Sequence, residues 1–448
     1  MNVYSLIYIV LAAILLLYTA MHRMDLLCVA AVCYIVYTIY CIPGIGISGF
    51  YRPKLSPQLY WCVYSQLLLI LLVSAILRNK EKRKDTLIRQ GIKADEEKVN
   101  EKIVYFSFLL YTAVIFAFAL VNIVKVGFSG FASGKLNVWE QTNVFYVISL
   151  YGTYPAFAYG IHKKKKLIWI PCLFVELTIF FAGSRAFAAT MVIIFLCERG
   201  SLLWKNRKKN FRIYILGALA VLFLLIYRMV DKQIMSGNIE GVFQTLSKPS
   251  TWAVALEFNE PRVIIANYDY VLTQKFRLPA GDVVYRIIDF IPGLSSLLHI
   301  DLKYPEYFSA WLQQEVHGSE GVGGTIWGES YAMFGYPGVF FATILWLVFV
   351  KACSKHLNYS KSHSYFVVAI GTYLSWYINR LDYNRVGQAC KVMLFCFLIW
   401  SAFYLCLGGV FHFKKTAFSI NKKSWINQTA VKPIRKAASC EQKSNDIF

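Results

Sequence analysis

Apolar runs alternate with short polar segments along most of the chain. A helix of roughly 20 apolar residues crosses the hydrocarbon core of a bilayer, which is about 30 Å thick. The sixth and seventh runs lie on either side of Gly183, and one long helix broken at this glycine is an alternative to two spans. The pattern predicts an all-α fold with eleven membrane spans, at about residues 3–20, 25–42, 58–77, 103–124, 142–161, 167–182, 186–203, 211–229, 328–350, 364–379 and 389–410.

Composition and charge support a polytopic integral membrane protein. The 448 residues are 57% hydrophobic and 16% charged, with a mean hydropathy of +0.48, which is outside the range of soluble globular proteins. Lys and Arg next to spans remain on the cytoplasmic side, and all basic clusters fall on one side if the N-terminus lies outside. The net charge of +22 is then a topology signal, and we expect no nucleic-acid partner. The clusters are at 78–102, 163–166, 205–209 and after 410.

One long stretch between predicted spans, residues 230–327, is not itself a span. Its apolar and polar positions recur at helical spacing, with breaks at Pro261, Pro279 and Pro292. We expect short helices lying at the outer membrane surface; a folded soluble loop without membrane contact is the alternative. The predicted organisation is eight spans over 1–229, the outer loop over 230–327, three spans over 328–410, and a basic cytoplasmic tail over 411–448 that we expect to be disordered after about residue 414.

Arginine is enriched on the predicted outer side, whereas lysine dominates the inner side. A topology signal needs only charge, but the guanidinium fork binds phosphate or carboxylate through two parallel hydrogen bonds. We therefore expect some of the outer arginines to bind an anion. This set consists of Arg52, Arg185, Arg228, Arg262, Arg277, Arg286, Arg380 and Arg385.

Five of these arginines have informative settings. Arg185 ends a Gly-Ser-Arg break at the outer end of a span, where a lipid phosphate would lie; a snorkelling side chain is the alternative. Arg262 and Arg286 lie on the expected surface helices, and a surface ion pair is the alternative to binding. Arg380 and Arg385 share a tight outer loop next to the membrane, which is more suggestive of a binding role than either alone.

The stretch from Glu315 to Gly338 combines glycines with groups that exchange protons. The glycines allow close backbone approach just before a span begins, as a loop that lines a ligand requires. His317, Glu315 and Glu329 are able to transfer a proton, with ordinary loop polarity as the alternative.

Other chemistry finds little support in the sequence. Glu176 is the single carboxylate in the middle of a predicted span, and hydrogen bonding within the bundle is its expected role, with a functional role as the alternative. The cysteines lie mostly in or beside apolar runs without metal-ligand spacing, so we expect neither disulfides nor a metal. Motifs for nucleotide hydrolysis, serine hydrolysis and zinc proteolysis do not occur, and we expect no cofactor.

Two motifs resemble a known family. The segments FAGSRAFAATMVIIFL at 181–196 and GGTIWGESYAMFGYPGVF at 323–340, with a large outer loop between late spans, resemble the O-antigen polymerases, the oligosaccharide repeat unit polymerases of the Wzy type. The second motif is the more specific one, and the rest of the chain resembles the family only in hydropathy.

The resemblance implies a GT-C-like glycosyltransferase of the bacterial inner membrane with its active site facing the periplasm. It implies donor and acceptor oligosaccharides carried on undecaprenyl pyrophosphate, no metal and no nucleotide sugar, and a polysaccharide chain-length regulator as a candidate partner. Negative charge develops on the leaving pyrophosphate, so we expect Arg185, Arg286, Arg380 and Arg385 to bind it.

The resemblance also suggests roles for the remaining candidates. His317 or Glu315 is expected near the acceptor hydroxyl, and Glu329 is expected to hold the glycine-rich loop. Arg262 and Tyr331 complete the residues expected to bind pyrophosphate or glycan.

Two alternatives to a polymerase stay open. An O-antigen ligase uses the same kind of donor and shares the Arg185 motif. A lipid-linked oligosaccharide flippase or another transporter belongs to a different class, whose members commonly carry charges within spans around a central cavity. Here polar residues concentrate in the outer loop, which favours chemistry at the membrane surface.

Overall fold

The computed structural model is all-helical in the part of the chain it describes, with sixteen α-helices and two short 3-10 helices. The helices are α1 (Val3–Ala20), α2 (Leu26–Thr38), α3 (Pro57–Ile88), α4 (Glu101–Ala132), α5 (Lys135–Gln141), α6 (Val144–His162), α7 (Lys166–Phe181), α8 (Ala186–Lys205), α10 (Ile239–Leu246), α12 (Glu260–Thr273), α13 (Ala280–Phe290), α14 (Leu294–Leu297), α15 (Phe308–Glu315), α16 (Ile326–Ser354), α17 (Ser364–Tyr377) and α18 (Tyr383–Thr429), with η1 (Ile39–Cys41) and η2 (Lys355–Asn358). The described residues are 3–21, 25–42, 55–88, 101–184, 186–205, 230, 233–234, 236–249, 260–291, 294–298, 308–315, 324–358 and 361–429.

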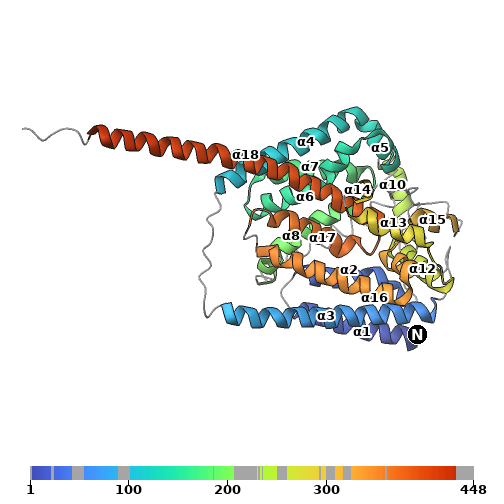
Figure 1. Ribbon diagram of the computed structural model, residues 1–448. Coiled ribbons are helices and arrows are strands. Elements are labelled where there is room, and N and C mark those ends of the chain that lie inside the picture. Colours follow the sequence, from blue (N-terminus) through green and yellow to red (C-terminus); the bar gives the residue numbers. More distant parts are fainter. Residues whose placement is uncertain are drawn as a thin grey trace, which may run out of the picture.

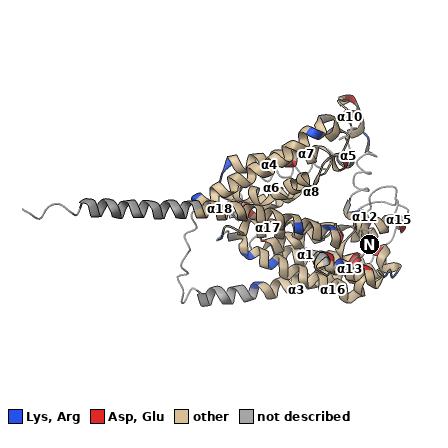
Figure 2. Cartoon of the chain, turned by 45° about the horizontal axis from the view of Figure 1, so that its top comes forward, with Lys and Arg blue, Asp and Glu red and all other residues tan. Residues whose placement is uncertain are grey.

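The protein is a multi-pass membrane protein. Within the described residues, five helical segments are long and apolar enough to cross a bilayer: Val3–Ala20, Pro57–Arg78, Glu101–Gly127, Ile326–Leu357 and Tyr383–Gly409. Shorter apolar helices, Leu26–Cys41 and Ala186–Glu198, add to them. The expected span at 211–229 lies outside the described residues, so the number eleven stays a prediction. Charged residues are few along the described helices and leave long uncharged stretches between them (Figure 2).

Helix α6 lies inside the bundle, in contact with α4, α7, α8, α17 and α18 (Figure 1). Its glycines allow close helix packing, because a Cβ at Gly152 would lie 2.7 Å from Ile115 and one at Gly160 would lie 2.8 Å from Trp169. Aromatic rings fill the space on its other faces, and Tyr159 stacks on Phe108 at 4.2 Å between ring centroids. The helix is therefore buried by neighbouring helices, which explains why its sequence can be less apolar than that of the outer helices.

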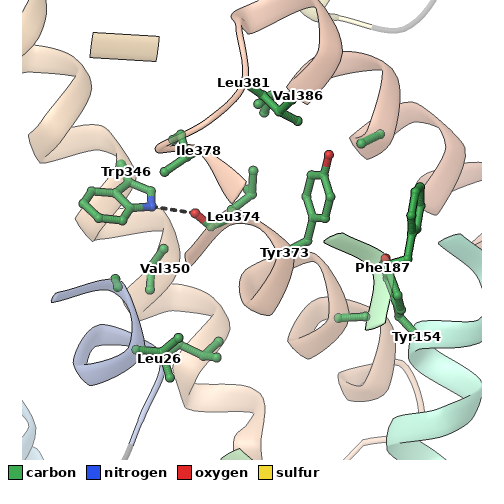
Figure 3. Packing of buried hydrophobic residues seen from close by; sticks show 14 of the residues in the cluster. Leu26, Tyr154, Phe187, Trp346, Val350, Tyr373, Leu374, Ile378, Leu381 and Val386 are labelled. Carbon is green, nitrogen blue, oxygen red and sulfur yellow. Dashed lines mark hydrogen bonds between the residues drawn. The ribbon is translucent and has the colours of Figure 1, made fainter. Parts of the chain in front are cut away.

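Aromatic residues also fill the centre of the bundle (Figure 3). Tyr373 of α17 lies near Tyr154 of α6 and Phe187 of α8, and Trp346 of α16 donates through Nε1 to the Leu374 carbonyl at 2.9 Å. The indole nitrogen of Trp346 thus finds a partner inside an apolar core, whereas the buried hydroxyl of Tyr154 has none among the described residues.

The two ends of the bundle differ. At one end, which we call the basic end, ion pairs join segments predicted to share the inner side: Arg78–Asp25 at 2.7 Å, His162–Glu198 at 2.6 Å and Lys163–Glu101 at 2.9 Å. At the opposite end, which we call the loop end, helices α12 to α15 gather (Figure 1). The predicted grouping of segments onto two sides is therefore reflected in these contacts.

Three details refine the sequence-based boundaries. Gly183 has φ +94° between α7 and α8, so the two apolar runs here are separate helices rather than one. Helix α4 extends to Ala132 through a kink at Gly127, where φ is 67°. The expected disordered tail is wrong in its first part, because α18 continues to Thr429; the segment from 410 to 429 contains neither Gly nor Pro that would end a helix.

Candidate functional site

The loop end contains a buried polar cluster that is centred on Glu329 in the first turn of α16. Thr325 caps this helix by accepting a hydrogen bond from the Trp327 amide at 3.3 Å, and a carboxylate in the first turn is favoured by the helix dipole. The Glu329 side chain is fully buried: its Oε1 accepts from Arg286 Nε at 2.5 Å, and its Oε2 accepts from the Tyr383 amide at 2.6 Å. Both carboxylate oxygens therefore connect α16 to other elements.

Asp382 is the second buried carboxylate of the cluster, with no solvent exposure. Its Oδ1 accepts from the Arg385 amide at 3.0 Å, which caps the start of α18. Its Oδ2 accepts from the hydroxyl of Ser309 at 2.9 Å and from the Ser309 amide at 3.3 Å. One side chain thus fixes both the beginning of α18 and the beginning of α15.

Two further hydrogen bonds close the cluster between α16 and the turn that joins α17 to α18. Trp327 donates through Nε1 to Asn379 Oδ1 at 3.2 Å. The hydroxyls of Ser330 and Tyr383 lie 2.9 Å apart. We call Ser309, Arg286, Glu329, Asp382 and Tyr383 the Glu329 cluster.

Arg277 lies against α16 next to this cluster. Its Nη1 donates to the Tyr331 carbonyl at 2.6 Å, and its guanidinium lies 4.4 Å from the centre of the Tyr331 ring. The carbonyl of Tyr331 and that of Ala332 are available to residues of the loop, and Leu278 donates to the latter at 2.9 Å. The helix is kinked just after these residues, at Gly335, where φ is 70°. The backbone of α16 thus takes part directly in the contacts with the loop segment.

An aromatic pair borders the same region. Phe276 and Trp311 are stacked with 3.6 Å between ring centroids, and both are partly exposed. Phe276 directly precedes Arg277, and Trp311 lies two residues after Ser309 on α15. The chain therefore holds both rings next to the Glu329 cluster, Phe276 through Arg277 and Trp311 through Ser309.

Helix α12 anchors the loop segment to the spans. Asp269 is buried and accepts from the amide and the hydroxyl of Ser56, just before α3 begins. Tyr268 donates to Gln66 in α3 at 3.4 Å, and burial raises the pKa of this phenol well above its ordinary value. The phenol therefore stays a neutral donor, and α12 is fixed by buried polar contacts at both of these residues.

The structure brings some of the predicted site residues together. Arg286, Glu329 and Tyr331 belong to the cluster or adjoin it, and Arg385 follows Asp382, with a half-exposed side chain 4.0 Å from the Asp382 carboxylate. Arg380 lies in the same turn with its guanidinium 5.3 Å from the centre of the Tyr377 ring.

Others lie elsewhere or are not described. Glu315 is exposed at the last residue of α15, about 9 Å from Ser309 along the helix axis at about 1.5 Å per residue. Arg262 lies in the first turn of α12 and is half-buried. Arg185 and His317 lie outside the described residues.

Arg286 is more deeply buried than its expected place on a surface helix implied. Its side chain is 2% exposed, and besides Glu329 it contacts Asp282, with 3.8 Å between Nη1 and Oδ2. An arginine whose donors point into the protein holds other residues in position. The guanidinium of Arg286 is not accessible from solvent, so its binding of pyrophosphate stays a prediction.

Sequence reasoning missed the parts played by Ser309 and Asn379 and underrated Asp382 and Arg277. An aspartate is a typical residue at the start of a helix, but the predicted span began at about residue 389, so Asp382 stood in the predicted outer loop and not next to the span; α18 in fact begins at Tyr383. The partners Ser309 and Asn379 carry no such signal, because only the tertiary fold brings them to the cluster.

Glu176 has the hydrogen bond expected for an acid inside the bundle. The Thr153 hydroxyl donates to its Oε1 at 2.6 Å, and the side chain is buried. Within the described ranges, no three His, Cys, Asp or Glu side chains gather in a way that could hold a metal ion.

Comparison of the chain with models of known protein families, with curated proteins and with solved structures finds no match. The class of protein therefore follows from the molecule itself: a multi-pass helical membrane protein with a buried polar cluster at one end of its bundle.

Proposed function

We propose that this protein is a membrane glycosyltransferase that polymerises oligosaccharide repeat units carried on undecaprenyl pyrophosphate, that is, an O-antigen polymerase acting at the periplasmic face of the bacterial inner membrane. One observation carries the proposal. Glu329, an element of the second family-like motif, is the centre of a buried cluster at one end of the spans, and Arg277, Arg380 and Arg385 lie around it.

The reaction requires charge stabilisation next to the membrane surface. The hydroxyl at the nonreducing end of the incoming unit attacks the anomeric carbon of the growing chain, and the bond from this carbon to the pyrophosphate oxygen breaks. The lipid pyrophosphate leaves with the bonding electrons, and the hydroxyl proton passes to a base. Guanidinium groups stabilise the departing charge, and Arg385, at the first turn of α18 with 49% of its side chain exposed, is suited to this role with Arg380.

The buried carboxylates support the site rather than transfer protons. Both oxygens of Glu329 already accept hydrogen bonds from Arg286 and Tyr383, so Glu329 holds the start of α16, and Arg286 is a positioning residue. His317 or Glu315 stays the proposed base near the acceptor hydroxyl, and Arg185 the proposed further ligand of the pyrophosphate.

The aromatic pair Phe276–Trp311 offers apolar faces to sugar rings. Sugars present C–H groups on one face and hydroxyls at the edge, and aromatic rings pack on the former while polar groups bind the latter. Arg277, which follows Phe276, and Gln314, which lies on α15 three residues after Trp311, are both exposed and are suited to binding hydroxyl groups there.

Polymerisation by the purified protein tests the proposal. The full chain in lipid nanodiscs would be incubated with lipid-linked repeat units and no metal or nucleotide sugar, and the products separated by size. We expect a ladder of glycans that increases by whole repeat units. A preparation that shows a cooperative thermal unfolding transition is folded. If such a preparation leaves the single units unchanged, the proposal is overturned.

A ligase differs in its acceptor, so the same assay distinguishes the two enzymes. With lipid A–core acceptor present, a ligase transfers glycan to this acceptor and forms no ladder on the carrier lipid. A transporter gives neither product but moves labelled lipid-linked units across the membrane.

A further inference from the structure

Helix α13 and the residue that follows it bury two charged side chains and expose three large apolar ones. Arg286 and Asp289 are only 3% and 7% exposed, whereas Val284, Ile287 and Ile291 are 50%, 53% and 52% exposed. A helix that faces water has the opposite arrangement, with apolar residues toward the protein and charges outward. Although Tyr285 and Ile288 are also buried and Asp282 is 45% exposed, the outward side of this segment is mostly apolar.

The inner side of α13 packs along α18, beside which it lies in Figure 1. Lys391 of α18 donates through Nζ to Asp289 Oδ1 at 2.8 Å. Lys391 lies about 12 Å from Tyr383 along the helix axis, at about 1.5 Å per residue. Since Tyr383 contacts Glu329 at the start of the spans, α13 extends from that level down along the body of α18.

The exposed apolar surface continues on the two helices that contact α13. On α14 and just after it, Leu297 and Leu298 are 75% and 49% exposed. On α18, one of the candidate membrane spans, Leu394, Phe395 and Leu398 are 43%, 48% and 56% exposed. Helix α13 thus packs against a helix that is itself a candidate membrane span with exposed apolar residues.

We infer that α13 and α14 are inserted into the bilayer at the loop end and that their exposed face binds phospholipid acyl chains. The loop segment is then partly a re-entrant element rather than a set of helices on the surface. Backbone that enters the membrane without crossing it is tolerated where protein covers its polar groups, and here α18 covers one side. The pairs Lys391–Asp289 and Arg286–Glu329 neutralise the two buried charges of α13, whereas Asp282 in its first turn is 45% exposed and lies 3.8 Å from Arg286.

Photolabelling from the lipid tests this inference, and it does not depend on the proposed function because no substrate is added. The full-length protein would be placed in nanodiscs of phosphatidylethanolamine and phosphatidylglycerol that contain a phospholipid with a diazirine in its acyl chain. Labelled peptides would be identified by mass spectrometry. We expect adducts on Val284, Ile287 and Ile291 at yields comparable to those on α18.

The internal controls decide the outcome. Leu394 to Leu398 of α18 should be labelled, and the exposed turn Gln274–Lys275 should not. Labelled α18 with unlabelled α13 would overturn the inference, and crosslinks between two copies through α13 in place of lipid adducts would do the same. Ile287→Glu should lose α13 labelling while α18 keeps it, and Ile287→Leu should behave like the natural protein.

Discussion

Arg286 donates through Nε to Glu329 Oε1 at 2.5 Å, and the two side chains are 2% and 0% exposed. The residues come from different parts of the chain, the loop helix α13 and the first turn of the span α16. This ion pair holds the loop helix against the membrane spans. Substitution of either residue leaves the charge of the other buried without its partner.

Single substitutions in this pair should destabilise the protein strongly. We expect Glu329→Gln and Arg286→Met each to lower the free energy of unfolding by about 3–5 kcal/mol, because each leaves an uncompensated buried charge or donor. The double variant should recover part of this loss. Thermal unfolding of the four proteins in detergent measures the coupling, and strictly additive losses would contradict a direct interaction.

The hydroxyl of Ser309 should contribute through Asp382. Ser309→Ala removes a hydrogen bond to a fully buried carboxylate, and we expect a loss of about 1.5–3 kcal/mol. Ser133→Ala is the matched control, because the Ser133 hydroxyl makes an exposed hydrogen bond at 2.8 Å and should change stability by less than about 0.5 kcal/mol. Equal effects of the two substitutions would show that Asp382 is satisfied without the hydroxyl.

Gly335 should not tolerate a side chain. Its φ of 70° disfavours other residues, and a Cβ would lie 3.0 Å from Arg277 Nη2. We expect Gly335→Ala to destabilise the protein by about 1–3 kcal/mol. Gly408→Ala in α18 meets no atom within 4 Å and should be neutral or stabilise the helix by up to about 1 kcal/mol, as unfolding midpoints would show.

Arg385 should act on the reaction rather than on the fold. We expect Arg385→Ala to lower kcat in the polymerisation assay by about 10²–10³-fold, the usual loss for one group that stabilises transition-state charge. Arg385→Lys keeps the charge but not the guanidinium fork and should restore activity only in part. Lys163→Ala at the basic end is the control and should keep full activity; a similar loss there would point to a general effect of charge.

Trp311 should affect the binding of glycan more than turnover. Removal of an aromatic face costs about 0.5–1.5 kcal/mol of stacking, so Trp311→Leu should raise KM for the acceptor by about two- to tenfold with little change in kcat. Phe174→Leu, on the exposed face of α7, is the control. An unchanged KM for the Trp311 variant would remove the aromatic pair from the proposed site.

The sequence was most informative about features that depend on neighbouring residues alone, such as the positions of apolar helices and of the breaks between them. Apolar runs located the helices, Gly183 separated α7 from α8 as two helices, and the glycine-rich stretch before α16 pointed to the region of Glu329. The pairing of Arg286 was not predictable, because its partner lies on a helix far along the chain, whereas a nearer acid, Asp289, stands three residues after it. In the structure Asp289 pairs with Lys391 instead.

The predicted helix ends were wrong where a helix continues beyond its apolar run. Helix α18 continues to Thr429, and the residues that follow the apolar run contain neither glycine nor proline, the two residue types that interrupt a helix most strongly. Hydropathy detects the membrane, whereas helix propensity decides where the helix ends.

Asp382 makes the start of α18 and the start of α15 mechanically dependent on each other. If α15 moves away, the carboxylate loses the Ser309 donors, and a reoriented carboxylate no longer caps α18. Displacement of α15 therefore costs both Ser309 hydrogen bonds and, if the carboxylate reorients, also the N-terminal cap of α18, so a ligand that moves α15 would weaken the first turn of this membrane helix.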